Sequence, residues 1–77
     1  MNQEDVVNSL SKAFGLPKSL SEKILKHFLS LIAKETKHGN NVKLRNFGTF
    51  EARFSYGKRR VKFDDSKNIF KHYGQEI

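Results

Sequence analysis

The apolar positions in the first part of the chain recur with the period of an amphipathic helix. Asn2 followed by Asp5 is typical of a helix start, with a side-chain acceptor and an acid in the first turn. Five apolar side chains then fall on one helical face: Val6, Val7, Leu10, Ala13 and Phe14. Gly15 is predicted to end this helix, and Pro17 suits the first turn of the next, where its missing N–H costs nothing.

The second predicted helix, about residues 17–37, has a wide apolar face. At ~100° per residue its apolar side chains cover about half of the circumference, whereas the stripe of an ordinary surface helix is nearer a third. This width indicates two contacts, one within the chain and one with a second copy. We therefore predict a dimer interface formed by five of these side chains: Leu20, Ile24, Phe28, Leu31 and Ile32. In the alternative interpretation, the first helix and the sheet cover the whole face.

From residue 39 onward the period changes to the two-residue alternation of strands. Gly39 is predicted to cap the second helix in the left-handed conformation. Short strands are then expected at residues 42–45, 49–54 and 60–63, with a turn at Tyr56-Gly57. Gly48, between two aromatic residues, indicates a bulge or a place where another backbone comes close.

A short closing helix is predicted near the end of the sequence. Asp64-Asp65-Ser66 is expected to cap its N-terminus, and the helix to run through Tyr73 and end at Gly74. The resulting class is α+β: two N-terminal helices, a three-stranded antiparallel sheet and a short C-terminal helix, in a single domain over residues 1–77. We expect core packing for most of the phenylalanines, namely Phe47, Phe50, Phe54, Phe63 and Phe70.

A chain of 77 residues buries a modest share of its surface, so the stability of its small core is marginal unless a disulfide, a metal or oligomerisation adds to it. The chain has no cysteine for a disulfide, and its three histidines lack the spacing of a zinc site. Oligomerisation is the remaining common way to stabilise so small a fold. The absence of cysteine also fits a reducing cytoplasm, and no apolar run reaches membrane length.

The net charge of +7 is concentrated in one segment. Residues 1–42 carry six lysines against four acids, and residues 63–77 two lysines against three acids. Residues 43–62 carry seven Lys or Arg residues against Glu51 alone, which is +6. Binding to a polyanion accounts for this concentration better than solubility does. The competing interpretation is a sheet edge protected from aggregation by positive charge.

Strand alternation predicts where these cations lie. Arg53, Arg60 and Lys62 should share the face opposite the core, with Lys58 and Arg59 at the hairpin end and Lys43 and Arg45 on the neighbouring strand. Such a surface matches phosphates along a backbone but has no obvious way to read bases. Tyr56 should be exposed in the turn. We predict salt-sensitive binding with weak sequence preference.

The sequence gives no support for catalysis. The histidines stand at helix edges or near a terminus, and no glycine-rich phosphate loop or nucleophile motif is present. We interpret the chain as a binding protein and not an enzyme, with no metal and no cofactor.

The segment Val42 to Glu51, with Phe47-Gly48-Thr49-Phe50 at its centre, resembles the HU/IHF family of bacterial nucleoid-associated DNA-bending proteins. The resemblance extends over nearly the whole chain. It implies an intertwined homodimer or heterodimer that seats duplex DNA on a saddle of strands, in the cytoplasm with the nucleoid. It also implies that Phe47, Phe50 and Phe70 lie at the dimer interface. The turn from Asn46 through Gly48 to Thr49 would approach phosphates through main-chain N–H groups, with Lys67 and Lys71 as the cations of the last helix.

Two departures from the family pattern change the expected function. Family members have a long β-ribbon arm with a proline that wedges between base pairs, whereas the only proline here is Pro17 and the hairpin is short. We therefore expect binding to duplex DNA with reduced or absent bending. Two alternatives stay open. The chain could pair with a full-length relative and regulate it through protein interaction, or it could bind RNA or polyanions generally.

Overall fold

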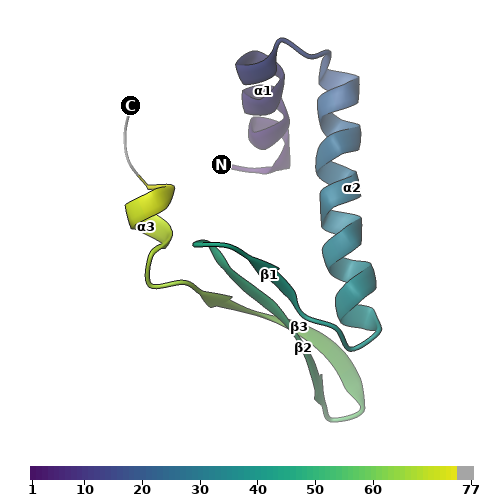
Figure 1. Cartoon of the computed structure of the whole chain (residues 1–77). Coiled ribbons are helices and arrows are strands. Elements are labelled where there is room, and N and C mark those ends of the chain that lie inside the picture. The colour runs from purple at the N-terminus through teal and green to yellow at the C-terminus, as the bar shows by residue number, and fades with distance from the viewer. Residues whose placement is uncertain (75–77) are drawn as a thin grey trace. The chain divides into compact units, whose positions relative to one another are not determined.

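The computed structural model describes residues 1–74, and their element order is that of an α+β protein (Figure 1). The helices are α1 (Gln3–Phe14), α2 (Lys18–Lys37) and α3 (Ile69–His72). The strands are β1 (Val42–Leu44), β2 (Gly48–Ser55) and β3 (Lys58–Asp65). The chain divides into two compact units, residues 1–31 and the residues from 32 onward, and α2 continues from the first unit into the second.

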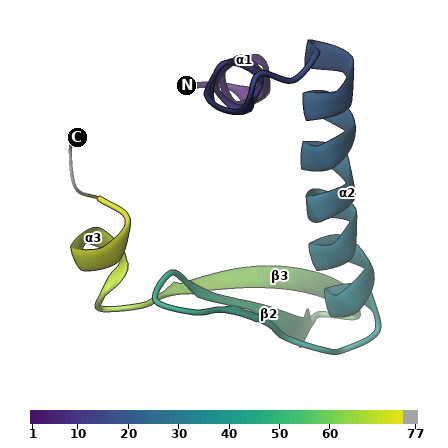
Figure 2. The same cartoon turned by 45° about the horizontal axis from the view of Figure 1, so that its top comes forward.

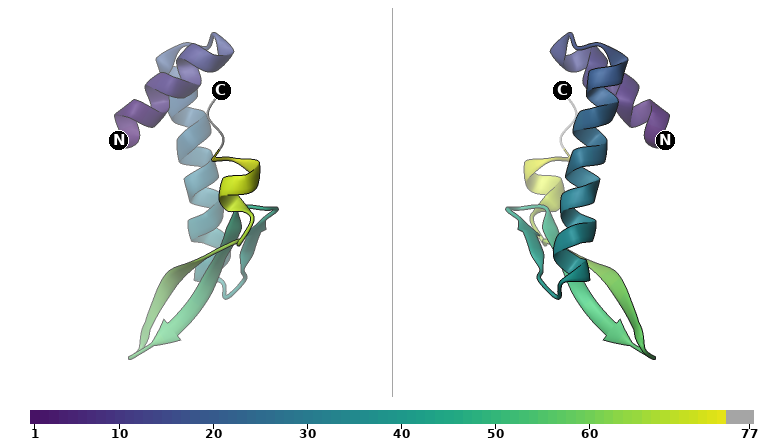
Figure 3. Two further views of the ribbon diagram at one scale, coloured as in Figure 1. Left: turned by 90° about the vertical axis from the view of Figure 1, so that its left-hand side faces the viewer. Right: turned by 90° about the vertical axis from the view of Figure 1, so that its right-hand side faces the viewer.

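The first unit consists of α1 and the first turns of α2, whose axes cross (Figures 2 and 3). The predicted helix start at Asn2 is confirmed, and the structure shows that it is a reciprocal capping box. The Asp5 N–H donates to Asn2 Oδ1 at 3.0 Å, and the Asn2 N–H donates to Asp5 Oδ2 at 3.0 Å. Gly15 ends the helix in the left-handed conformation at φ 64°. Val7 and Ser21 are buried in this unit.

The apolar face of α2 is largely exposed in the single chain. Ile32 is buried, but the exposed fractions of five other apolar residues lie between 40% and 47%: Leu20, Ile24, Phe28, Leu29 and Leu31. On the solvent side, Lys26 forms an ion pair with Glu22 at 2.8 Å, and its hydrogen bond and charge lower the pKa of the Glu22 carboxyl. The wide apolar face predicted from the sequence is therefore present, and within residues 1–74 most of its side chains are only partly covered.

The second unit contains an antiparallel sheet in the order β1-β2-β3. All eight residues of β2 pair with all eight of β3, from Gly48–Asp65 to Ser55–Lys58. By contrast, β1 pairs with only the first three residues of β2. The outer part of β2 and β3 is thus a two-stranded ribbon that extends beyond β1 (Figure 3). Both strands are longer than predicted, because the ladder continues to the turn on one side and to Asp65 on the other.

An aromatic cluster holds the base of this ribbon together. The ring of Phe63 lies 5.5 Å from that of Phe47 and 4.9 Å from that of Phe50, and Tyr73 packs edge-on against Phe47. Gly48 lies directly beneath the Phe63 ring, and its pairing shows no bulge. Of the two possibilities that the sequence indicated for Gly48, the structure shows the close approach of another backbone, because the Asp64 carbonyl oxygen would lie 2.7 Å from a Cβ at this residue.

The predicted N-cap at Asp64-Asp65-Ser66 is wrong. Asp64 and Asp65 are the last residues of β3, where they pair with Thr49 and Gly48. The cap of α3 is Asn68, four residues later than Asp64, and its side chain makes no capping hydrogen bond. Ser66 forms the turn before it, with its Oγ accepting from the Asn68 N–H at 3.1 Å. Backbone pairing with β2 therefore takes precedence over the local capping signal.

The prediction of core packing is also wrong for two aromatic residues of the single chain. Phe54 is 69% exposed because it lies on the ribbon beyond β1, and Phe70 is 79% exposed on α3, which is a single turn long. Phe47, Phe50 and Phe63 do pack together, although Phe63 is still 41% exposed in the single chain.

Gly48→Ala should lower the free energy of unfolding by about 1–3 kcal/mol, the usual cost of overpacking. A Cβ at residue 48 would lie 2.5 Å from Cζ of Phe63 and 2.7 Å from the backbone oxygen of Asp64, and the second clash involves main chain that no rotamer change relieves. Urea unfolding at fixed protein concentration measures the change. Thr49→Ala, at the next position on the opposite face, is the control and should shift stability by less than about 0.5 kcal/mol. Equal stability of Gly48→Ala and the parent protein would contradict this packing account.

Candidate nucleic-acid interface

The register of β2 with β3 divides the hairpin into two chemically different faces. Residues directly opposite each other in an antiparallel pair point to the same side, and the sides alternate along each strand. One side, which we call the polar face, carries Thr49, Glu51, Arg53, Ser55, Lys58, Arg60, Lys62 and Asp64. The other, which we call the aromatic face, carries Phe50, Ala52, Phe54, Arg59, Val61 and Phe63.

Charge on the polar face is graded along the ribbon. At its base, Lys43 of β1 and Asp64 of β3 flank Thr49. In the next row Glu51 is opposite Lys62. Beyond it, Arg53, Arg60 and Lys58 are all exposed and form the outer cations of the polar face. The base of the ribbon is thus nearly balanced in charge, and the positive excess is at the outer end.

Arg53 and Arg60 are direct cross-strand partners. Side chains in such a pair have Cβ atoms about 5 Å apart, and like charges placed there destabilise a sheet. Glu51 offsets part of this repulsion, because its Oε2 accepts a 2.7 Å hydrogen bond from Nη2 of Arg53. Arg60 has no comparable acid opposite it. The arrangement costs stability in the free protein and favours an anion beside the pair.

Arg59 lies apart from the other cations of the hairpin. It is on the aromatic face, where its guanidinium carbon is 5.5 Å from the centre of the Phe54 ring. Its Nη1 also approaches Gly39, just after α2, and would lie 3.4 Å from a Cβ at that residue. Arg59 is therefore an exposed cation on the opposite face from Arg60, although the sequence groups it with its neighbours Lys58 and Arg60.

The remaining predicted contact residues lie at the base of the ribbon. Arg45 and Asn46 form the turn between β1 and β2, with Asn46 at φ 60° and the Phe47 N–H donating to the Leu44 carbonyl at 3.0 Å. Gly48 is buried in the sheet.

The last two predicted contact residues, Lys67 and Lys71, belong to the segment after β3. A 3.3 Å hydrogen bond from the Tyr73 hydroxyl to the Arg45 carbonyl joins this segment to the turn between β1 and β2. The structure thus separates the predicted contact residues into an outer group and a basal group.

A hollow of about 240 Å³ opens between the basal turn and the end of β3. Lys43 lines it, but Asp64 and Asp65 do so as well, together with Asn46, Thr49 and Ser66. The two carboxylates make it a poor site for a phosphate. The outer cations are the better anion surface.

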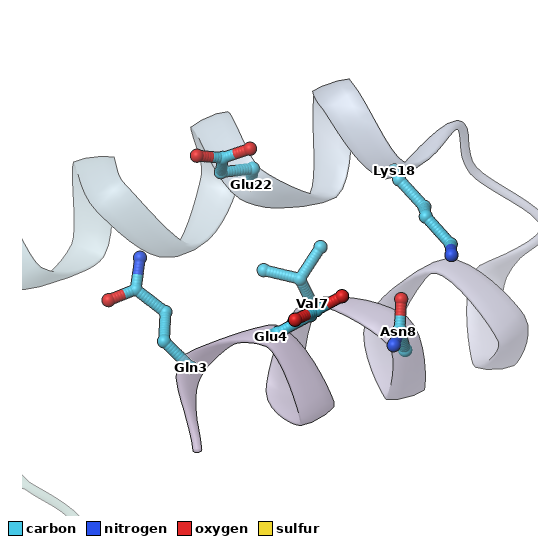
Figure 4. Close-up of a pocket in the computed structure, with 6 residues that line it drawn as sticks. All are labelled: Gln3, Glu4, Val7, Asn8, Lys18 and Glu22. Atoms are coloured by element: carbon cyan, nitrogen blue, oxygen red, sulfur yellow. The ribbon is translucent and has the colours of Figure 1, made fainter.

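A second hollow, of about 370 Å³, lies within the first unit between α1 and the start of α2 (Figure 4). Glu4, Val7 and Asn8 line it from α1, and Lys18 and Glu22 line it from α2. Its two acids outnumber its one cation, so it does not suit a phosphate either. Among the described residues, Asn8 Oδ1 has no hydrogen-bond partner.

Sequence reasoning missed two features of the charged hairpin. Glu51 is the counterion of Arg53, a pairing that the two-residue spacing on one strand face could have indicated. The position of Arg59 over Phe54 follows from the register at the turn, which pairs these two residues directly. Its approach to Gly39 had no signal in the sequence.

Comparison with known proteins shows which family the chain belongs to. The family model for the bacterial DNA-binding proteins matches residues 1–70. The chain therefore belongs to this family, which includes the HU proteins, and the resemblance to the HU/IHF family stated above is confirmed.

Two curated HU proteins show the relationship in sequence. The protein is similar to DNA-binding protein HU of Buchnera aphidicola, with 39% identity over 51 residues, which are 66% of this chain and 55% of the relative. It is also similar to DNA-binding protein HU-beta 2 of Neisseria meningitidis, with 33% identity over 52 residues, 68% of this chain and 57% of the relative. The chain thus spans little more than half the length of these relatives.

Solved structures confirm the fold class. A variant of HU from Thermotoga maritima has a TM-score of 0.79 and 25% identity, over 97% of this chain and all of that chain. HU of Anabaena in a cocrystal with DNA has a TM-score of 0.78 and 22% identity, over 94% of this chain and 95% of that one. In residues 1–74 no helix combines the length and apolar character needed to cross a membrane.

Proposed function

We propose that the protein binds duplex DNA through its phosphates, using the outer cations of the polar face, with little preference for sequence. The observation that carries this proposal is the direct opposition of Arg53 and Arg60. A structural role gives no reason to place two arginines side by side at a cost in stability. A phosphate beside them turns the repulsion into charge-assisted hydrogen bonds.

Family membership supports DNA as the polyanion, because the related HU proteins are named for DNA binding. Phosphate contacts fix position on the duplex without reading bases. Lys62, Lys43, Arg45 and Asn46 extend the contact toward the base of the ribbon, and Lys67 and Lys71 extend it further. Because its proposed ligand is DNA, we place the protein in the cytoplasm, at the nucleoid. We propose that residues 1–77 act together as one such domain, without enzymatic activity.

The ribbon is too short to wrap a duplex. Strands of eight residues reach roughly 25 Å, and part of that length is covered by β1. The only proline of the chain, Pro17, lies between α1 and α2, so no proline is available at the tip to wedge between base pairs. Bending a duplex costs several kcal/mol, which additional contacts must offset. We therefore infer that the protein binds DNA with little bending.

We further propose that the active form is a homodimer. The half-exposed apolar residues of α2 would be covered by a second copy, as would Phe70. Phe47 and Phe50 would complete the interface at the base of the sheet. Pairing with a longer relative, as a regulator, is a second candidate because the ribbon is short. The retained outer cations favour direct DNA binding over that regulatory role.

Arg60→Ala should weaken binding to a blunt 20-base-pair duplex about five- to tenfold, roughly 1–1.4 kcal/mol. Arg59→Ala is the matched control, since it removes the same charge one residue away on the aromatic face, and it should weaken binding by less than about twofold. Fluorescence anisotropy at fixed salt measures both variants. Equal losses would show that only net charge matters and would contradict the assignment to the polar face.

Binding should leave the end-to-end distance of a duplex nearly unchanged, because the ribbon lacks the length and the proline that favour a kink. Energy transfer between dyes on the two ends of a 30-base-pair duplex measures this distance at saturating protein. A large rise in transfer efficiency would contradict the proposed mode of binding.

The protein should sediment as a dimer at micromolar concentration, because dimerisation buries the half-exposed face of α2. Phe28→Ala should shift the protein toward monomer or unfolded chain, whereas Lys23→Ala, on the polar side of the same helix, should not. A folded monomer of the parent protein in sedimentation equilibrium would refute the dimer.

A further inference from the structure

Tyr56 is the outermost side chain of the hairpin, and the fold gives no reason for its presence. It is the first of the two turn residues between β2 and β3 and is 97% exposed. A side chain this exposed adds almost nothing to packing.

The backbone at this position is unfavourable for a tyrosine. Tyr56 has φ 50° and Gly57 φ 73°, the left-handed conformation that both central residues of a two-residue hairpin turn adopt. Asn, Asp and Gly are preferred there, and a bulky residue in this region is an outlier. Backbone strain of this kind gathers at functional sites, where the side chain is retained for what it contacts.

The surroundings of the ring indicate what it contacts. Lys58 follows the turn directly on the polar face, and the opposed pair Arg53 and Arg60 lies one row further in. Proteins that hold single-stranded nucleic acid combine such cations, which track the phosphates, with aromatic side chains on which bases stack. In an intact duplex the faces of the bases are covered by their neighbours. An unpaired base leaves its face open to a ring.

We propose that Tyr56 is a stacking site for an unpaired nucleobase, with Lys58 and Arg60 on the phosphates beside it. This inference rests on the proposed function, because the outer cations bring the nucleic acid to the tip. The chemistry is common to an unpaired base of DNA and one of RNA. Duplex binding through phosphates needs no ring, so Tyr56 adds affinity only where a base is open.

The first experiment uses the tyrosine fluorescence of the protein. The chain has two tyrosines and no tryptophan, so Tyr73→Phe leaves Tyr56 as the only emitter while keeping the ring that packs on Phe47. Titrations with a single-stranded deoxyribo-oligonucleotide, the same sequence in RNA and a blunt duplex follow the emission. Either single strand should quench at least half of the Tyr56 emission. The strand that quenches at the lower concentration identifies whether DNA or RNA supplies the stacked base. The blunt duplex should bind with little quenching. Binding of both single strands without quenching would overturn the proposal.

The second experiment separates this proposal from the proposed function. The parent protein should bind a duplex with a single-stranded overhang on the order of tenfold more tightly than a blunt duplex. Tyr56→Asn, which suits the turn, should lose this preference and keep its affinity for the blunt duplex. Tyr56→Phe should retain the preference, because the ring is kept.

Two results would overturn the proposal in different ways. If Tyr56→Asn keeps the preference for the overhang, Tyr56 is not the stacking site, and the proposed duplex binding stands. If the parent protein binds neither duplex, the proposed function fails and the stacking site fails with it.

Discussion

The continuous eight-residue pairing of β2 with β3 is the constraint on which the rest of the structure depends. It decides which side chains share a face, and a slip by one residue would move every cation of the polar face to the other side. Two local features hold the register. At the base, Phe63 lies over Gly48, where no larger residue fits. At the tip, the turn at Tyr56 and Gly57 closes the hairpin with two left-handed residues.

This pairing has an energetic cost that points to function. It places Arg53 opposite Arg60 and leaves Phe54 and Tyr56 exposed, and each of these features weakens or fails to support the free hairpin. In natural proteins such locally unfavourable features occur mainly at functional sites, where a bound ligand stabilises them. A similar cost applies to α2, because five apolar side chains of its wide face are each nearly half exposed in the single chain. A partner copy there and a polyanion at the hairpin would together relieve these costs.

Much of this architecture could be predicted from the sequence, since it follows from short-range signals. The helix start at Asn2, the helix end at Gly15 and the turn at Tyr56-Gly57 are each local, and the structure confirms all three. The alternation around Arg53 and Arg60 correctly placed both on one face. The predicted cap at Asp64-Asp65-Ser66 was wrong because an acidic pair can end a strand as readily as it starts a helix, and here the pairing of Asp64 and Asp65 with β2 decides. The contact of Arg59 with the segment after α2 links residues 20 positions apart, which no local pattern encodes.

We propose that the cations of the polar face contact phosphates, and the salt dependence of duplex affinity tests this proposal most directly. Each phosphate contact contributes about 0.9 to the slope of log affinity against log salt concentration. If Arg53, Arg60 and Lys62 each make one, the triple substitution of these residues by alanine should reduce the slope by about 2 to 3. An unchanged slope in the triple variant, or affinity of the parent protein that does not respond to salt, would contradict the account.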